Sequence, residues 1–515
     1  MEFKILFTLI PAVLFVNLAH SENIIFFYGG GTYSHKHAIW PLTSALADKG
    51  HKITFLSPHN KRPWLHPNIT DVIPEKLEKL LSVFHIQDKL QQRLAGEELK
   101  VWNTLGDWSL SICKTILDDD DPTLQSLIYK SKFDLIFVNA AFGECAYIMN
   151  LVWKGKIILV DSTSILPYFP DIIGLNVETS WIPDISSQFL YPMGYFDRIH
   201  NFFYSIKFLY DRQYKLYPEL EKLMQQVLRV DKVQNFAALE LESTNIVFLN
   251  THYTTDFARA LPPNIIHVGG LQFWEPRVET IPEKMRRFMD DAEEGIILMV
   301  LGTSYDLSKT NEKFHTIFWE TVKAFPKIRF IFSWEGETPE HIPKNLLLSK
   351  WMPQKEVLGH PKMKAFISHC GLYSIAEATY HGVPIIGIPL VADEDYDVYR
   401  IEMEAIGVRL EVKTMTSPEL QKAVKEVLTN KKYQNNMKKL SKLTRERPMS
   451  PIDTGVWWAE MVLRHDDLST LKPRTENLSW IQLRNLDVFA FIFLIISLIT
   501  ILIAKIINFG ISILI

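Results

Sequence analysis

One segment of the chain places several polar side chains directly after a predicted strand. The strand at residues 364–368 runs into His369 and Gly371, and Ser374 follows in the first turn of a predicted helix. Backbone N–H groups at a helix start, reinforced by the helix dipole, favour anions. The serine hydroxyl and the imidazole N–H add two further donors at the same place. Such a set of donors suits a pyrophosphate group.

The side chains around this segment suit the remainder of a nucleotide sugar. Glu377, one helical turn further on, can accept hydrogen bonds from a ribose diol. The flat indole of Trp351 and the amide of Gln354 suit stacking on a uracil base and recognising its edge. Asp393 and Glu394 follow another predicted strand, where carboxylates can bind sugar hydroxyls. Ligands of open parallel sheets bind at the carboxyl ends of strands, so we expect these residues to converge.

Two series of alternating strands and helices are available to position these residues. Residues 23–28 form an apolar run that ends in three glycines, and a helical pattern separates it from the next strand. This order of strand, helix and strand indicates a parallel sheet. A polar, proline-containing linker after Gly269 and Gly270 leads into the second series. The predicted strands are residues 23–28, 52–56, 133–138, 156–160, 246–250, 296–301, 329–333, 364–368 and 383–388.

The composition excludes several classes of protein. The chain has 515 residues, of which 22% are charged and 47% hydrophobic, and its formal charge is −4. These values are typical of globular proteins rather than disordered ones. A nearly neutral chain lacks the concentrated basic surface that nucleic-acid binding requires. Its 3 cysteines allow one disulfide at most, so the fold depends mainly on packing.

Both ends of the chain contain apolar segments with a targeting pattern. Residues 1–21 combine Lys4, an apolar stretch and small residues, which predicts a cleaved secretory signal. Near the other end, residues 487–508 contain an apolar run long enough for one transmembrane helix. A signal followed by a C-terminal anchor predicts a type I membrane protein whose bulk lies in the secretory lumen. The glycosylation sequons at Asn68 and Asn477 are consistent with that side of the membrane.

Several short motifs surround the predicted pyrophosphate site. They are WMPQ at 351–354, HP at 360–361, FISHCG at 366–371, EA at 377–378, GVPIIGIP at 382–389 and RPMSPIDTGVWWAEMVLRH at 447–465. Together these motifs resemble the signature of the UDP-glycosyltransferases, which include the animal glucuronosyltransferases and, closer to this chain, the insect glucosyltransferases. The resemblance extends from the end of the signal to the anchor. It implies a two-domain GT-B fold and an inverting reaction that needs no metal or other cofactor.

The resemblance and the two strand series together define the expected domains. An N-terminal, acceptor-binding Rossmann-like domain is expected over residues 22–268, followed by a linker over residues 269–285. A C-terminal Rossmann-like domain that binds the UDP-sugar is expected over residues 286–450, facing the first domain across a cleft. Residues 451–476 resemble the closing helices that return from the second domain to the first.

The family places its general base in the loop after the first strand. His35 matches that histidine. Because imidazole titrates near neutrality, it can take the proton of an acceptor hydroxyl. The resemblance also assigns residues to the stabilisation of the departing UDP. They are His369, Gly371, Ser374 and Thr303, the last at a position where the family has a serine.

The residue expected to support this histidine departs from the family pattern. The family commonly has a carboxylate after the strand at residues 133–138, and this chain has Asn139. An amide can hold the imidazole by a hydrogen bond but does not stabilise its positive charge. Three explanations stay open: Glu144 supplies the carboxylate, the acceptor is acidic enough to need little base, or catalysis has been lost. A phenol or an electron-rich aromatic carbon fits the second explanation.

The residues expected near the donor sugar also differ from the family. The usual Asp-Gln pair is Asp393-Glu394 here, and Asp397 stands where an asparagine is usual. The added negative charge is expected to repel the carboxylate of a glucuronate. We therefore predict a neutral hexose, with glucose as the first choice.

Aromatic residues are dense between residues 168 and 204. Two interpretations stay open: a surface that packs against the sheet or the membrane, and a site for a flat apolar acceptor. The residues are Tyr168, Phe169, Trp181, Phe189, Tyr191, Tyr195, Phe196, Phe202, Phe203 and Tyr204.

These patterns and the resemblance predict a membrane-anchored, inverting UDP-glycosyltransferase. It is expected to move glucose from UDP-glucose, a co-substrate, to a small lipophilic acceptor such as a phenolic, a pigment or a hormone, through an O- or a C-linkage. The expected partners are the donor, the acceptor and the lipid bilayer, with self-association into a homo-oligomer left open. Relatives place the enzyme in the endoplasmic reticulum membrane with lumenal catalytic domains. The competing predictions are a catalytically impaired UDP-sugar-binding membrane protein and a UDP-glucuronosyltransferase.

Overall fold

The computed structural model describes most of the chain. The described residues are 21–60, 62, 65–82, 86–97, 102–118, 120–162, 172–175, 178–184, 187, 189, 192–274, 279–302, 305–339, 341–390, 393–475 and 478–514. All but the last residue of the predicted signal, and the predicted site residues Thr303 and Asn477, lie outside these ranges.

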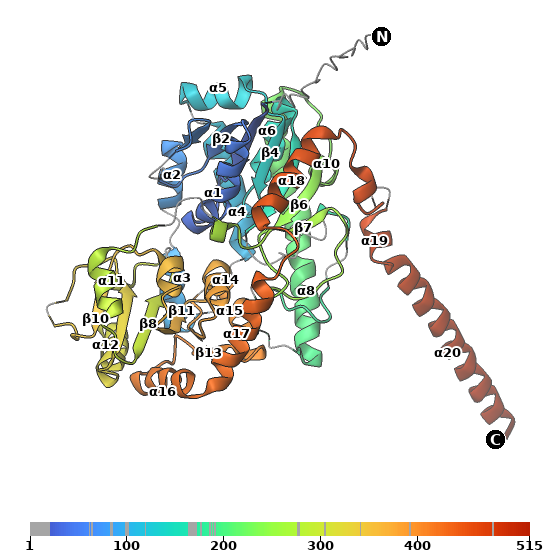
Figure 1. Ribbon diagram of the computed structural model, residues 1–515. Coiled ribbons are helices and arrows are strands. Elements are labelled where there is room, and N and C mark those ends of the chain that lie inside the picture. Colours follow the sequence, from blue (N-terminus) through green and yellow to red (C-terminus); the bar gives the residue numbers. More distant parts are fainter. Residues whose placement is uncertain are drawn as a thin grey trace, which may run out of the picture.

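The N-terminal half builds the first of two parallel sheets (Figure 1). Its seven strands lie in the order β3-β2-β1-β4-β5-β6-β7, and all neighbours are parallel. Helices cover both faces of this sheet, which explains why its inner strands are continuous apolar runs in the sequence. The strands are β1 (Asn23–Phe27), β2 (Lys52–Leu56), β3 (Ile69–Val72), β4 (Leu135–Asn139), β5 (Lys156–Asp161), β6 (Thr244–Leu249) and β7 (Ile265–His267).

Two apolar layers hold the helices on this sheet. On one face, Phe26 and Leu42 share a buried cluster with Val456 and Ala459 of α18, near the C-terminus. On the other face, Phe27 and Ile136 pack with residues of α4, α6 and α9. The helices of this half are α1 (Tyr33–Asp48), α2 (Glu75–Ser82), α3 (Ile86–Ala95), α4 (Trp102–Leu117), α5 (Pro122–Lys130), α6 (Glu144–Trp153), α8 (Tyr195–Asp211), the π-helical turn η1 (Arg212–Leu216), α9 (Tyr217–Leu228), α10 (Phe236–Ser243) and the short η2 (Leu271–Trp274).

The C-terminal half builds the second sheet, also parallel throughout. Its six strands lie in the order β10-β9-β8-β11-β12-β13, so the chain forms the pair of Rossmann-like units that the sequence predicts. The strands are β8 (Gly295–Val300), β9 (Ile328–Ser333), β10 (Leu346–Ser349), β11 (Met363–Ser368), β12 (Ile385–Gly387) and β13 (Gly407–Arg409). The helices are α11 (Glu283–Asp290), η3 (Leu307–Lys309), α12 (Glu312–Ala324), α13 (Gln354–Leu358), α14 (Leu372–His381), α15 (Glu394–Met403), α16 (Ser417–Thr429), α17 (Lys431–Arg445), α18 (Pro451–Arg464), η4 (Ser469–Leu471), α19 (Trp480–Leu483) and α20 (Leu486–Leu514).

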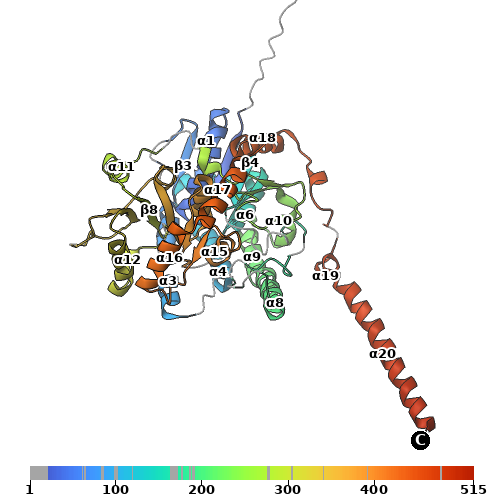
Figure 2. The same ribbon diagram turned by 60° about the horizontal axis from the view of Figure 1, so that its bottom comes forward.

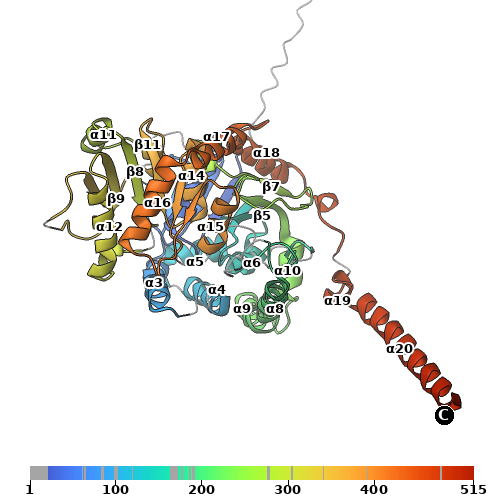
Figure 3. The same cartoon turned by 90° about the horizontal axis from the view of Figure 1, so that it is seen from below.

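Two helices cross from one half of the chain to the other. α18 follows the second sheet in sequence but packs on the first, beside α1 (Figure 1). α3 does the reverse: its Leu90 is fully buried in the core of the second sheet, and Figures 2 and 3 show this helix beside the C-terminal half. The two halves therefore exchange packing elements rather than meeting at a single surface.

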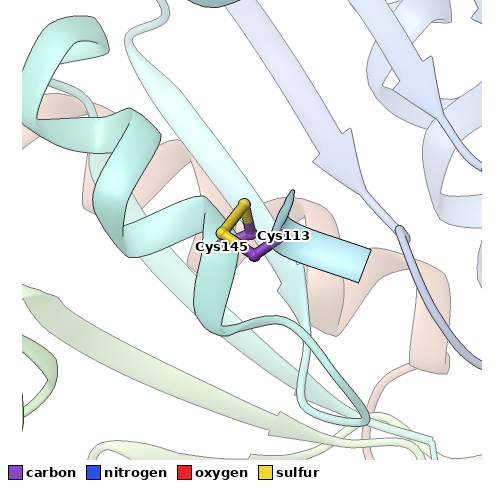
Figure 4. The surroundings of a disulfide bond; sticks show 2 residues. All are labelled: Cys113 and Cys145. Carbon is purple, nitrogen blue, oxygen red and sulfur yellow. A yellow bond between two sulfur atoms is a disulfide. The ribbon is translucent and has the colours of Figure 1, made fainter. Parts of the chain in front are cut away.

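A disulfide links two helices on one face of the first sheet. It joins Cys113 of α4 to Cys145 of α6, with their Cα atoms 5.0 Å apart (Figure 4). Cys370 is a buried free thiol. The single pair fits the limit set by three cysteines, and it is typical of a protein that folds in an oxidising compartment.

The last helix stands away from the rest of the molecule (Figure 1). Within Leu486–Ile513 of α20, the most apolar 18-residue window has a mean hydropathy of 2.9 and buries none of its residues against the protein. A helix of 28 residues is longer than the roughly 20 residues that cross a bilayer core. By length and composition, α20 is suited to the predicted membrane span.

Candidate active site

His35 and Asn139 meet at a glycine in the loop after β1. Gly31 has φ +89°, and a Cβ added to it would lie 2.6 Å from His35 Nδ1 and 2.8 Å from Asn139 Nδ2. A side chain at this position would therefore collide with both groups, in addition to the backbone strain of a positive φ. His35 itself lies in the first turn of α1, and Asn139 is the fully buried last residue of β4. The adjacent carboxyl ends of β1 and β4 thus bring the two residues together.

Asn139 faces the Nδ1 side of the imidazole. Its Nδ2 donates to the carbonyl oxygen of Gly30 at 3.3 Å. Its Oδ1 and His35 Nδ1 are both buried without a hydrogen-bond partner among the described residues. In histidine-carboxylate pairs the supporting group also lies at Nδ1, and the opposite nitrogen, Nε2, exchanges protons with the substrate. Asn139 is therefore placed to orient His35 without contributing a charge.

Burial keeps His35 in its neutral form. Loss of solvation, with a smaller contribution from the neighbouring His59, lowers the pKa of His35 to about 4. An imidazole with that pKa is deprotonated at pH 7 and able to accept a proton, although it is a weak base.

Glu144 is occupied elsewhere. Its Oε1 pairs with Arg212 of η1 at 2.6 Å, and the same guanidinium binds Glu240 of α10 at 2.6 Å. This buried ion cluster holds α6, η1 and α10 together on one face of the first sheet. Of the two residues expected to support His35, the structure brings Asn139 to the ring and commits Glu144 to Arg212.

The loops after β8 and β11 come together around His369. A Cβ on Gly302 would lie 3.1 Å from His369 Nε2, and one on Gly371 would lie 2.6 Å from the same atom. Gly371 is the N-cap of α14, so the helix begins beside this imidazole, with Ser374 in its first turn. Free N–H groups at that end and the helix dipole favour an anion here. Burial lowers the pKa of His369 to about 4, so its imidazole is neutral at pH 7.

Gln354 connects the residues predicted to bind the nucleoside. Its Nε2 donates to Glu377 Oε2 at 2.8 Å and lies 3.3 Å from Ser374 Oγ. Burial raises the pKa of Glu377 to about 7, with the Gln354 hydrogen bond acting in the opposite direction. Trp351 is 52% exposed, and its ring lies edge-on to Tyr33 of α1, with centroids 6.1 Å apart. Trp351 is thus half exposed where the two halves meet.

The carboxylates near the predicted sugar position differ in their surroundings. Glu394 accepts hydrogen bonds from Tyr305 Oη at 2.9 Å and from Leu390 N–H at 2.6 Å, inside the C-terminal half. Burial, followed by repulsion from Asp393, raises the pKa of Asp397 well above its usual range, which favours the uncharged acid. Asp393, the partly exposed N-cap of α15, is the most accessible of the three carboxyl groups. Glu394 is thus hydrogen-bonded within the C-terminal half, and Asp397 favours its uncharged form. Much of the negative charge expected near the donor sugar is therefore not available there.

One aromatic residue next to His35 was not among the predicted site residues. Tyr373, in the first turn of α14, lies edge-on to the His35 ring with centroids 6.2 Å apart. Asn250, directly after β6, donates from Nδ2 to Tyr373 Oη at 3.2 Å. Both had a detectable signal, because Tyr373 adjoins Ser374 in the strongest motif and Asn250 ends a predicted strand.

The interface between the two sheets therefore contains an unsatisfied polar centre. His35 Nδ1, Asn139 Oδ1 and Asn250 Oδ1 are all buried without hydrogen-bond partners among the described residues. Buried polar atoms are satisfied in most proteins, and exceptions concentrate at sites that bind or react. The arrangement can hold a polar group between a neutral base on one half and an anion-binding helix start on the other.

Comparisons with known proteins agree with this geometry. Residues 31–515 match the family described as UDP-glucoronosyl and UDP-glucosyl transferase. UDP-glucosyltransferase 2 of Dactylopius coccus is 31% identical over 96% of this chain and 93% of its own length. UDP-glucuronosyltransferase 2B18 of Macaca fascicularis is 26% identical over 92% of this chain and 90% of its own length.

Solved structures confirm the architecture. The calicheamicin glycosyltransferase CalG4 superimposes with a TM-score of 0.55 over 87% of this chain and 99% of its own, at 15% identity. The spinosyn forosaminyltransferase SpnP gives 0.54 over 87% of this chain and 100% of its own, at 13% identity. These neighbours have the GT-B fold. The chain therefore belongs to the UDP-glucoronosyl and UDP-glucosyl transferase family and is a UDP-glycosyltransferase of GT-B fold.

Proposed function

We propose that this enzyme transfers glucose from UDP-glucose to the hydroxyl of a small, lipophilic phenol, with inversion at the anomeric carbon. The observation that carries the proposal is His35, a neutral base whose Nδ1 side meets Asn139 and whose ring meets the first turn of α14. The resemblance of the motifs and the 31% identity to an insect UDP-glucosyltransferase support glucose as the sugar.

The proposed reaction is a single displacement. The acceptor oxygen forms a bond to the anomeric carbon while the bond from that carbon to the β-phosphate oxygen breaks. The acceptor proton moves to His35 Nε2, and UDP leaves with the electron pair. His369, the N–H groups near Gly371, and Ser374 disperse the developing charge on UDP, and Thr303 is proposed to assist them.

The weakness of the base determines the proposed class of acceptor. Asn139 lies beside the imidazole without adding a charge, and the pKa of His35 is about 4. Proton transfer to such a base is easier from an acidic hydroxyl than from an aliphatic one. Phenols meet this requirement, and an electron-rich aromatic carbon, which would give a C-glycoside, is the second class to test.

We further propose that the enzyme works at the lumenal face of the endoplasmic reticulum membrane. The apolar helix α20, the Cys113–Cys145 disulfide and the sequon at Asn68 support that location. An anchored enzyme meets lipophilic acceptors where they concentrate, in the bilayer and its interface.

UDP release by microsomes that contain the full chain tests the proposal. UDP-glucose and UDP-glucuronate are supplied separately with a panel of phenols, aliphatic alcohols and electron-rich aromatics. We expect release with UDP-glucose and phenols, lost in His35→Ala and kept in His465→Ala, which changes an exposed histidine after α18. Faster release with UDP-glucuronate would make the enzyme a glucuronosyltransferase. UDP binding without release across the panel would favour a non-catalytic UDP-sugar-binding protein.

A further inference from the structure

Tyr373 belongs to the donor half of the enzyme but contacts the base of the acceptor half. It is the second residue of α14, immediately before Ser374. Its ring meets the His35 ring at an interplanar angle of 78° with centroids 6.2 Å apart, an edge-to-face contact. The helix start that is suited to the diphosphate and the proposed base are therefore in direct contact through one side chain.

The hydroxyl of Tyr373 is fixed to the edge of the first sheet. Asn250 Nδ2 donates to Tyr373 Oη at 3.2 Å, and Asn250 is only 3% exposed. The backbone N–H of Asn250 in turn donates to the carbonyl oxygen of Asp161, at the end of β5, at 3.0 Å. Tyr373 is thus held at both ends of its side chain: by the backbone of α14 and by the carboxyl ends of β5 and β6.

Two hydrogen-bonded contacts between the halves lie away from the base. Arg400 donates to the carbonyl oxygen of Thr254 at 2.9 Å, and Thr254 Oγ1 lies 2.7 Å from Thr444 Oγ1. These bonds join the halves without touching His35. The Tyr373–Asn250 contact is different, because it sets the spacing between the halves at the reacting position itself.

We propose that Tyr373 is a positioning residue, which holds the His35 imidazole at a fixed place relative to the sugar donor bound at α14. The proposal rests on the role of His35 as base. It explains how an imidazole that lies beside the Asn139 amide, without a hydrogen bond to it or to a carboxylate, keeps a productive orientation. The Tyr373 ring packs against the imidazole, and the hydrogen bond from Asn250 fixes the position of that ring. Misplacement of a catalytic group by about 1 Å can cost roughly 100-fold in rate.

Two single substitutions and their combination test the hydroxyl contact. Tyr373→Phe keeps the ring and removes the bond, and Asn250→Ala removes the donor. We expect each to lower kcat about 5-fold with an unchanged Kd for UDP, and the double variant to be no worse than either single one. Tyr433→Phe, the same chemical change on α17, is the matched control. Additive losses, or unchanged kcat in both single variants, would overturn the proposed contact.

Removal of the ring gives a second readout that a general structural role does not move. Tyr373→Ala exposes the imidazole to water, so we expect the acid limb of kcat/KM to rise from about pH 4 toward pH 6. If the acid limb of kcat/KM is the same in Tyr373→Ala as in the wild type, Tyr373 does not shield the imidazole as proposed. Thermal unfolding of both variants shows whether the fold is intact.

A chemical measurement keeps this inference testable if the proposed transfer reaction fails. Diethyl pyrocarbonate modifies accessible neutral imidazoles, and mass spectrometry follows the modification of His35 alone. We expect Tyr373→Ala to raise the rate at His35 about 5-fold while leaving His465 unchanged. Equal rates at His35 in both proteins would overturn the inference, whether or not glucose is transferred.

Discussion

His35 lies between two uncharged side chains, the Asn139 amide and the Tyr373 ring. Neither stabilises an imidazolium, and burial lowers the pKa of the base to about 4. His35 is consequently neutral at physiological pH, but it binds a proton weakly. Under the proposed mechanism, in which His35 is the base, this combination links the choice of acceptor to a single position, residue 139.

Asn139→Asp should convert the enzyme to one with a stronger base. A carboxylate on the Nδ1 side stabilises the imidazolium and raises the pKa of His35. We expect the acid limb of kcat/KM to move from about pH 4 toward pH 6. Turnover with aliphatic alcohols should rise about tenfold or more relative to phenols, because a carboxylate beside a catalytic histidine contributes strongly to rate.

Steady-state kinetics with a matched phenol and alcohol check this expectation. Thermal unfolding is followed in parallel, since the substitution also removes the amide bond to Gly30. If the pH profile and the ratio of the two acceptors stay as in the wild type, residue 139 does not support the base.

Glu377 should make donor binding depend on pH near neutrality. Its carboxylate is expected to accept the ribose hydroxyls, and burial raises its pKa to about 7. The charged form, which binds better, is lost as pH falls through 7. If only that form binds, the Kd of UDP-glucose rises about tenfold from pH 8 to pH 6.

Isothermal titration with UDP-glucose measures this dependence, because its diphosphate does not titrate in that range. Glu377→Gln should bind more weakly at pH 8 and show a flat profile. A tenfold dependence that persists in Glu377→Gln would place the titrating group elsewhere.

At the scale of elements, α3 fastens the N-terminal half to the donor half. Arg93 binds Asp395 at 2.6 Å and Glu411 at 2.9 Å, and its side chain is 4% exposed. Asp395 lies in the first turn of α15, next to Glu394 and the helix cap Asp393. The ion cluster thus positions the helix start that is expected to meet the donor sugar.

Arg93→Met should destabilise the protein by about 2–4 kcal/mol, because it leaves buried carboxylates with less compensation. Arg286→Met is the control: its pair with Glu283 on α11 is exposed and should contribute under about 1 kcal/mol. Denaturant unfolding of the two variants measures the difference. Equal losses in the free energy of unfolding would show that the buried ion cluster stabilises the protein no more than the exposed pair does.

The aromatic side chains of α8 and η1 form an exposed surface. Tyr195, Phe196, Phe203, Tyr210 and Tyr214 are between 56% and 74% exposed. In Figure 1, α8 and α20 extend toward the same side of the molecule. Of the two interpretations of this region, exposure favours contact with the membrane interface over an acceptor site for these residues. Tyr168, Phe169 and Tyr191 lie outside the described residues.

A chain that ends at Leu483 should therefore still bind lipid vesicles weakly. Phe196→Ser with Phe203→Ser should release this truncated chain, because both large apolar side chains leave the interface. Trp457→Ser, at a 49% exposed position on α18, is the control. Co-sedimentation with vesicles measures binding, and equal sedimentation of all three proteins would remove α8 from the membrane contact.

At the scale of the whole molecule, three features together predict the membrane topology: the apolar helix α20, the Cys113–Cys145 disulfide and the sequon at Asn68. We expect the full chain to resist alkaline extraction from membranes and the chain ending at Leu483 to be released. Asn68, just before the edge strand β3, should carry a glycan that endoglycosidase removes, and Asn68→Gln should lack that shift. A full chain without any glycan would place the catalytic halves on the other side of the membrane.

The sequence predicts the inner strands of both sheets but not the edge strands. Every inner strand of both sheets was predicted: β1, β2, β4, β5 and β6 in the first sheet, and β8, β9, β11 and β12 in the second. The edge strands β3, β7, β10 and β13 were missed. Inner parallel strands are buried on both faces and read as apolar runs, whereas edge strands of 3 or 4 residues lack that signal.

The site divides in the same way between local and distant information. The sequence by itself determined that the motif around His369 and the residue His35 follow strands of the two sheets, because glycines, polar side chains after strands and a helix start leave a readable local pattern. Only the tertiary structure decided that Glu144 forms an ion pair with Arg212. The same holds for the hydrogen bond from Tyr305 to Glu394 and for the ring contact between Tyr373 and His35. These contacts join residues up to hundreds of positions apart. The first two pairings depend on packing within one half and the third on how the two halves pack together, and no local pattern encodes either kind of packing.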